Sequence, residues 1–317
     1  FLASQGQSNY ISNYLKELRG HGMKNPYKRN DVFTCHYARH AAFANRVSAW
    51  HVLVAKKCYP QGCLEFKWSC ALLNKGKRCS RGFSRMGRLC PGCAHYRDEK
   101  VHYQPSITLS PAEYALFQQE LAAFDEWVEE NQGRERDIAF RIDSLKPRFH
   151  KQIDAHGARL RLEGYLLIAR EGFIGLDAFD DYFYAVISPQ QQERLALAPG
   201  DELDARGVFA LDQGRLLFPR LHAVEVRSRS GAATWHNSSA LVAKQSARPL
   251  PRQPEKCLHC PQGALVDVTE HSNGQERRRR ELICLEGLEG GEECYFQAMQ
   301  QIAAEPAGCA TRPRTKY

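Results

Sequence analysis

Two cysteine pairs near the C-terminus have the residue types and the spacing of a metal site. Cys257 and Cys260 form a C-x2-C pair, and Cys284 and Cys294 form a second, more widely spaced pair. A C-x2-C pair lets two thiolates on one turn bind a single ion, and four thiolates suit zinc. A pair of disulfides is the alternative, because cysteine spacing alone does not distinguish the two.

The segment between these pairs has the pattern of a β-hairpin. Ala264-Leu-Val-Asp-Val268 and Arg280-Glu-Leu-Ile283 flank Asn273-Gly274, a dipeptide that favours a tight hairpin turn. With its four cysteines, the segment resembles a zinc ribbon. The resemblance implies a domain over residues 257–305 in which Cys257, Cys260, Cys284 and Cys294 hold a zinc ion.

Seven further cysteines lie between residues 35 and 93. Cys90-Pro-Gly-Cys93 is typical of a metal-binding turn, because Pro and Gly tighten it and leave backbone amides free to bond the sulfurs. We expect Cys70 and Cys79 to complete that site. Cys58 and Cys63 either form a second site with Cys35 and a histidine or supply alternative ligands to the first. Four thiolates bind zinc or a four-iron (4Fe-4S) iron-sulfur cluster equally well, so both cofactors stay open.

The positive charge of the chain is concentrated in its first third. The net charge is +8, but residues 1–105 carry 18 Lys and Arg against 5 Asp and Glu, or +13, which leaves −5 for residues 106–317. A field of this sign attracts phosphate backbones or acidic partners. The candidate nucleic-acid contacts are Lys75, Lys77, Arg78, Arg81, Arg85 and Arg88 among the cysteines, and Arg277 and Arg279 on the predicted ribbon. Charge runs are also common as solvated surface, which is the alternative for both groups.

Helical signals follow the cysteine-rich segment. Ser110-Pro-Ala-Glu113 is typical of a capped helix start, and an apolar stripe at spacings of three and four continues to Val128. A similar spacing from Ile138 to Ile153, interrupted by Pro147, predicts a second helix. Together these predict a helical hairpin over residues 106–156.

Strand signals dominate the next 70 residues. Five runs, at 159–170, 182–188, 202–210, 215–218 and 222–227, are separated by turn sequences such as Ala198-Pro-Gly-Asp201. The long first strand contains Gly164, where a barrel strand would bend, and residues 157–228 resemble an OB-fold. The resemblance implies a small five-stranded β-barrel; an SH3-like barrel is the alternative.

The sequence therefore predicts a multidomain α+β protein. A polar arm (1–30) precedes a basic, cysteine-rich, metal-bound module (31–105), whose fold we expect to depend on metal more than on an apolar core. The helical hairpin (106–156), the OB-like barrel (157–228), a linker (229–256), the zinc ribbon (257–305) and a disordered tail (306–317) follow. The sequence begins with Phe1 and not with Met, so it does not show where the natural chain starts.

These features favour a nucleic-acid-binding or assembly factor with structural zinc. The alternative is an iron-sulfur protein with a redox role that docks an acidic protein partner. Grouped C-x2-C cysteines predict a reducing, cytoplasmic location, and no stretch is apolar enough to predict membrane insertion. No sequence motif specifies a reaction, so we do not predict an enzyme.

Overall fold

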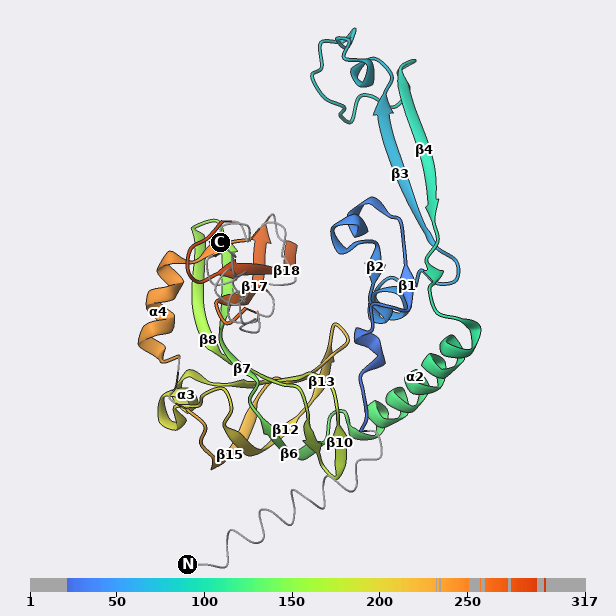
Figure 1. Cartoon of the computed structure of the whole chain (residues 1–317). Coiled ribbons are helices and arrows are strands. Elements are labelled where there is room, and N and C mark those ends of the chain that lie inside the picture. The colour runs from blue at the N-terminus through green and yellow to red at the C-terminus, as the bar shows by residue number, and fades with distance from the viewer. Residues whose placement is uncertain are drawn as a thin grey trace, which may run out of the picture. The chain divides into compact units, whose positions relative to one another are not determined.

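Figure 1 shows the computed structural model of the chain, which is mixed α and β and consists mostly of strands. The structure describes residues 22–231, 233, 235–250, 257, 260–272, 275–289 and 294. The chain divides into two compact units. Residues 24–131 form most of one, here called the cysteine-rich unit, and most of the remaining residues form the other, here called the sheet unit.

The cysteine-rich unit combines short strands with one long helix. A three-stranded sheet has the order β2-β1-β5, and a separate antiparallel hairpin consists of β3 and β4. The elements are η1 (Pro26–Lys28), β1 (Phe33–Thr34), η2 (Ala38–Phe43), β2 (Arg46–Val47), η3 (His51–Ala55), β3 (Cys63–Cys70), η4 (Leu73–Lys75), β4 (Tyr96–Tyr103), β5 (Ser106–Ile107) and α2 (Pro111–Asn131).

Helix α2 confirms the first predicted helix. The backbone N–H of Ser110 donates to Oε2 of Glu113 at 2.9 Å, and the N–H of Glu113 donates to Oγ of Ser110 at 3.4 Å. These reciprocal bonds are a capping box. Phe117 and Phe124 are buried on the apolar face, so the helix packs by the predicted stripe.

The cysteine-rich unit has an apolar core, contrary to the expectation that metal would replace one. Val32, Phe33, Val52 and Phe117 lie in one buried cluster with Cys35 and Cys58. Phe117 belongs to α2, which the sequence assigned to a different domain. The end of the predicted polar arm also joins this unit, because Tyr27 is buried and its hydroxyl donates to Oδ1 of Asp125 at 2.7 Å. Residues 1–21 of the predicted arm lie outside the described residues.

The sheet unit contains two larger sheets. In the part of the chain that the structure describes, an eight-stranded curled sheet has the order β13-β14-β11-β8-β7-β17-β18-β16, and a five-stranded sheet has the order β10-β9-β6-β12-β15. The elements are β6 (Glu135–Arg141), β7 (Ser144–Asp154), β8 (Gly157–Ala169), β9 (Gly172–Ile174), β10 (Asp177–Phe179), β11 (Phe183–Ile187), α3 (Pro189–Leu195), β12 (Glu202–Val208), β13 (Ala210–Asp212), β14 (Arg215–Phe218), β15 (Leu221–Ser228), α4 (Asn237–Ser246), β16 (Arg248–Pro249), β17 (Gly263–Ser272) and β18 (Gln275–Cys284).

The prediction of a second helix, from Ile138 to Ile153, is wrong, because this part of the chain forms β6 and β7. Leu145, Pro147, Phe149 and Ile153 also fit a two-residue period, and Ile and Phe favour strands. Pro147 pairs with Tyr165 of β8, whereas β7 pairs with β17 only from Phe149 onward. Proline is therefore tolerated, since it lies before the section of β7 that has neighbours on both sides.

The predicted barrel strands exist, but they do not form a barrel of their own. β8, β11 and β14 belong to the eight-stranded sheet, whereas β12 and β15 belong to the five-stranded one. Their neighbours include β6, β7 and β17, which the sequence assigned to other domains. At Gly164 the backbone of β8 lies very close to the end of β11, because a Cβ at this position would lie 2.2 Å from the carbonyl oxygen of Ile187.

The predicted C-terminal hairpin is confirmed, but it is not a separate module. Ser272 pairs with Gln275, and β17 runs parallel to β7 in the eight-stranded sheet. The predicted linker also carries structure, since α4 and β16 lie within residues 229–256. The predicted tail (306–317) lies outside the described residues. None of the described helices combines the length and the apolar character needed to cross a bilayer.

Candidate metal centre and nucleic-acid interface

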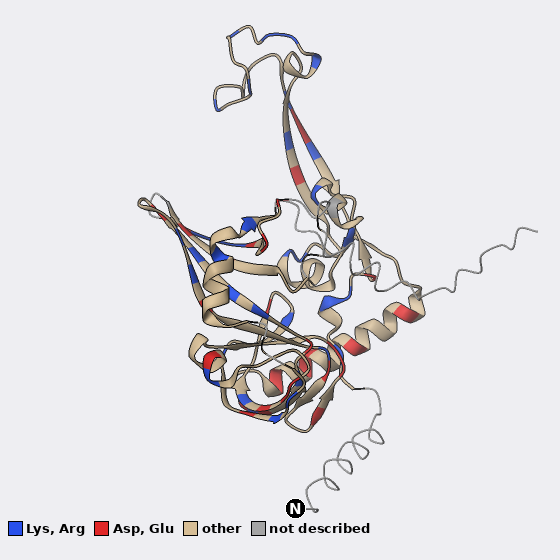
Figure 2. Cartoon of the chain, turned by 60° about the vertical axis from the view of Figure 1, so that its left-hand side comes forward, with Lys and Arg blue, Asp and Glu red and all other residues tan. Residues whose placement is uncertain are grey.

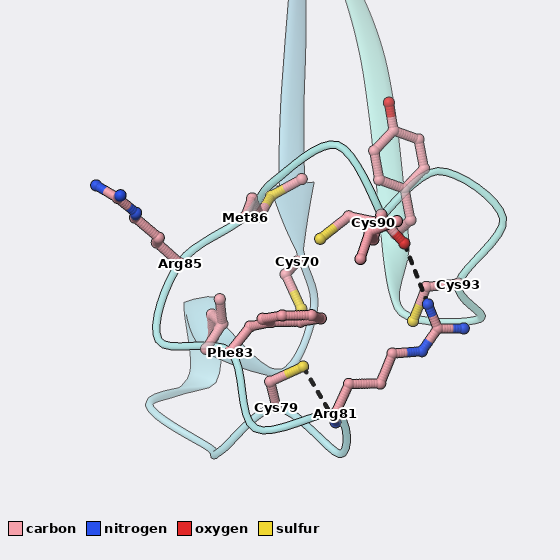
Figure 3. A pocket seen from close by; sticks show the side chains of 11 residues that line it. Cys70, Cys79, Arg81, Phe83, Arg85, Met86, Cys90 and Cys93 are labelled. Atoms are coloured by element: carbon pink, nitrogen blue, oxygen red, sulfur yellow. Dashed lines mark hydrogen bonds between the residues drawn. The ribbon is translucent and has the colours of Figure 1, made fainter.

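The loop between β3 and β4, residues 71–95, is here called the head loop, and it encloses a pocket. In Figure 1 it lies at the far end of the β3–β4 hairpin from the rest of the cysteine-rich unit. All four cysteines predicted for the first metal site line this pocket, as Figure 3 shows. The lining residues are Cys70, Leu73, Cys79, Arg81, Phe83, Arg85, Met86, Leu89, Cys90, Cys93 and Tyr96.

Strand pairing and tight turns bring together these cysteines, which lie within a stretch of 24 residues. Cys70 pairs with Tyr96 at the last rung of the hairpin. The Cys90–Cys93 turn closes with a hydrogen bond from the N–H of Cys93 to the carbonyl of Cys90 at 3.0 Å. A similar bond joins Gly82 to Cys79 at 3.0 Å. The head loop therefore folds back on itself twice, with thiols at both turns.

Backbone amides point at two of the sulfurs. The N–H of Arg81 donates to Sγ of Cys79 at 3.4 Å, and the N–H of Gly87 donates to Sγ of Cys90 at 3.3 Å. Backbone hydrogen bonds from Arg81 and then Phe83 lower the pKa of Cys79. Amide donors of this kind stabilise a thiolate, the form of cysteine that binds metal.

The cations of the head loop are exposed and carry no local counter-charge. Lys75, Lys77, Arg78, Arg81, Arg85 and Arg88 are all exposed. Residues 71–95 contain no Asp or Glu, and Figure 2 shows Lys and Arg along the loop. These cations take part in none of the ion pairs among the described residues. Arg81 also connects two parts of the head loop, because its Nη1 donates to the carbonyl of Leu89 at 3.1 Å.

The arginines of the predicted ribbon, residues 277–280, differ, because three of the four form ion pairs with acidic neighbours, whereas Arg277 is exposed. Arg279 forms ion pairs with both Glu270 and Glu281, and Arg278 is paired with Glu276. Arg280 contacts Asp267 at 2.8 Å. Pairing of this kind lowers the charge available to a phosphate backbone, so Arg279 is a weaker candidate contact than the sequence predicted.

Cys58 and Cys63 lie together in the core of the cysteine-rich unit, beside Cys35. Cys35 and Cys58 are each 2% exposed. Burial, aided by the hydrogen bond and charge of Cys63 and by Cys35, raises the pKa of Cys58 to about 11. The structure therefore brings together three cysteines of the predicted second group, in and beside a buried apolar cluster.

Three of the four predicted ribbon ligands, Cys257, Cys260 and Cys284, lie at one end of the β17–β18 hairpin. Cys257 and Cys284 lie in an apolar cluster with Leu250 and Leu282. Gly263 pairs with Cys284, and its N–H donates to the carbonyl of Cys260 at 3.0 Å. Cys294 is described only as half-buried, since its neighbours in sequence lie outside the described residues.

Sequence reasoning missed a lysine at this end of the hairpin. Lys146 of β7 is 4% exposed, and its Nζ donates to the carbonyl of Gly263 at 3.2 Å. Burial lowers its pKa to about 8, against the opposing charges of Cys260 and Cys257. No local pattern could have predicted this, because the contact depends on the parallel pairing of β7 with β17.

No group of three or more His, Cys, Asp or Glu side chains within the described ranges is placed to hold a metal ion. Searches of family models, curated proteins and solved structures for relatives of this chain find no match.

Proposed function

We propose that this protein binds nucleic acid through the head loop, whose shape a metal centre maintains. The observation that carries the proposal is the set of six exposed cations, free of local carboxylates, on a loop that encloses four cysteines. Exposed Lys and Arg bind phosphates by releasing condensed counterions. A loop held at fixed curvature loses less conformational entropy on binding than a free one.

The metal centre would be held by Cys70, Cys79, Cys90 and Cys93. The donor set fits, because thiolates with backbone N–H partners are ligands for zinc and for iron-sulfur clusters. A bound metal would link the two turns of the head loop. It would stabilise the loop, because the loop has few buried apolar side chains of its own. A second zinc ion at Cys257, Cys260, Cys284 and Cys294 would make the β17–β18 hairpin a zinc ribbon built onto the sheet unit.

Binding measured against salt tests the nucleic-acid proposal. We expect the logarithm of the association constant to fall linearly with the logarithm of salt concentration, with a slope of about −0.7 to −0.9 for each phosphate contacted. Fluorescence anisotropy with labelled DNA and RNA, single-stranded and duplex, measures this slope. Affinity independent of salt, or no binding to any of these probes at low salt, contradicts the proposal.

One observation favours a second candidate, an iron-sulfur protein that docks an acidic partner. Four cysteines line one pocket. A four-iron cluster binds each cysteine through a different iron, so its ligands surround a group larger than one ion. Anaerobic purification followed by metal, sulfide and absorption analysis separates the candidates. Brown protein with iron and labile sulfide identifies the cluster, whereas colourless protein with zinc in the head loop excludes it.

A further inference from the structure

The β3–β4 hairpin exposes large apolar side chains on one face. Leu64, Phe66 and Trp68, here called the apolar stripe, are 61%, 51% and 65% exposed. They occupy alternate positions of β3, so they point to the same side. Side chains of this size are normally covered, and an exposed row of them indicates a surface used for binding.

The register of the hairpin shows what surrounds the stripe. Residues paired directly across an antiparallel ladder share a face, and Lys100 pairs with Phe66. The Nζ of Lys100 lies 5.7 Å from the centre of the Phe66 ring. His102 pairs with Leu64, and Asp98, the one acidic side chain on this face of the hairpin, pairs with Trp68.

The stripe leads directly to the pocket of the head loop. Cys70 is the next residue after Trp68 on this face, and it pairs with Tyr96. Both Cys70 and Tyr96 line the pocket, as do Arg81 and Arg85 of the head loop. The face of the hairpin that carries the exposed aromatic rings therefore leads to the cationic head loop.

We propose that the apolar stripe stacks the bases of a single-stranded nucleic acid whose phosphates contact the head loop. This inference rests on the proposed function and specifies its ligand. The bases of a duplex are stacked on one another, whereas the bases of a single strand are free to lie on aromatic rings. Residues two apart on a strand are about 6.8 Å apart, which leaves room for a base against each ring. Lys100 adds a positive charge beside the Phe66 ring.

The test replaces the rings and keeps the apolar surface. The double variant Phe66→Leu/Trp68→Leu retains large apolar side chains on β3, so the hairpin should fold as before. The probes are a labelled oligothymidylate and an abasic strand of equal length and charge. We expect the variant to bind the oligothymidylate roughly 5-fold to 100-fold more weakly for each stacked ring lost. Binding of the abasic strand and the salt slope should not change.

The control variant is Leu176→Ala, which removes an apolar side chain that is 98% exposed on the sheet unit. It should bind both probes like the wild type. An unchanged thermal unfolding midpoint for each variant excludes misfolding as the cause of a loss.

The outcomes separate this inference from the proposed function. Wild-type protein that binds neither probe in a salt-dependent way overturns the proposed function. Wild-type binding with a normal salt slope, together with an unaffected double variant, overturns the stacking role alone; a stripe that docks a protein gives this second result. Equal losses on the abasic strand, or equal affinity for a duplex of the same length, also overturn it.

Discussion

The head loop and the β17–β18 hairpin both carry arginines and cysteines, but their cations lie in different electrostatic surroundings. Arg78, Arg85 and Arg88 are exposed in a segment without carboxylates. Arg279 and Arg280 each contact acidic side chains on β17 or β18. These two arginine-rich segments therefore differ in the positive charge that they offer to a ligand. Strand pairing places acidic side chains near the arginines of β18, whereas the head loop contains none.

The cysteines of the two regions differ in a similar way. Cys257 and Cys284 pack with leucines at one end of a large sheet. In the head loop, a 3₁₀ turn (η4) and hydrogen-bonded turns bring Cys79, Cys90 and Cys93 to the pocket. We expect the head loop to depend on metal for its shape, whereas the sheet would hold the C-terminal hairpin without it.

The largest expected effect is the loss of metal from the head loop. Cys79→Ser should remove one metal centre and make residues 71–95 much more sensitive to limited proteolysis, since metal binding supplies much of the folding free energy of such segments. Cys257→Ser should lower the metal content while the β17–β18 hairpin stays protected. Elemental analysis and mass spectrometry of the fragments measure both.

Cys35→Ser is the matched control for these variants, because Cys35 is buried in the apolar core of the same unit as the head loop. Its metal content should equal that of the wild type. Loss of metal from this variant would show that the core cysteines are ligands.

Neutralising the arginines compares the two regions directly. Arg78→Gln/Arg85→Gln/Arg88→Gln should reduce the salt slope of nucleic-acid binding by about 2 to 3, since each phosphate contact contributes about 0.7 to 0.9. Arg278→Gln/Arg279→Gln/Arg280→Gln should reduce it by less than about 1. Equal reductions in the two triple variants would refute the distinction between free and paired cations.

Glycines at the two C-x2-C turns should also differ. A Cβ at Gly263 would lie 1.8 Å from the backbone oxygen of Cys257, so Gly263→Ala must displace backbone and should lower the free energy of unfolding by about 3 kcal/mol or more. Gly92 has a φ of +84° in open space, and Gly92→Ala should cost about 1 to 2 kcal/mol within the head loop. Thermal unfolding should respond to Gly263→Ala more strongly.

The smallest effect concerns the ion pairs that join the C-terminal hairpin to β7. Burial alone would raise the pKa of Asp267, but hydrogen bonds and charges from Arg280 and Arg148 together lower it. Asp267→Asn should cost about 1 to 2 kcal/mol near pH 7, a range that allows for the partial exposure of the pair.

The pH dependence of this contribution follows from the sign of the shift. A carboxyl with a lowered folded-state pKa stabilises the protein above its ordinary value of 3.8 and loses that effect as pH falls through the lowered value. The gap in unfolding free energy between wild type and Asp267→Asn should therefore close in acid. A gap that stays constant down to pH 2 would contradict the assignment.

Several elements were predictable because their signals are local. The capping box at Ser110 and the stripe from Tyr114 to Val128 predicted α2, and Asn273-Gly274 predicted the turn of the β17–β18 hairpin. Cys70, Cys79, Cys90 and Cys93, which the spacing grouped as one metal site, line one pocket, and metal binding by them stays a prediction. No strand was predicted over β3, although Leu64, Phe66 and Trp68 alternate with other side chains there, and their exposure depends on the fold.

Non-local pairing explains the errors. The segment around Leu145 and Phe149 fits both a helical and a strand period, and only its partners β8 and β17 select the strand. The barrel strands form as predicted, yet β8 and β12 pair with β7 and β6, which lie outside the predicted barrel. β7 in turn pairs with β17, more than 100 residues away, as Val266 does with Phe149. Such pairings depend on the burial of whole sheets, which a short window of sequence does not encode.

Composition and spacing show where the thiols and the positive charges are concentrated, because both are properties of the chain alone. The fold sets which charges are free. Ion pairing, as between Arg279 and Glu270, depends on which strands lie together. It likewise decided that Cys58 is a core residue while Cys79 faces a pocket, because burial is set by packing among distant segments.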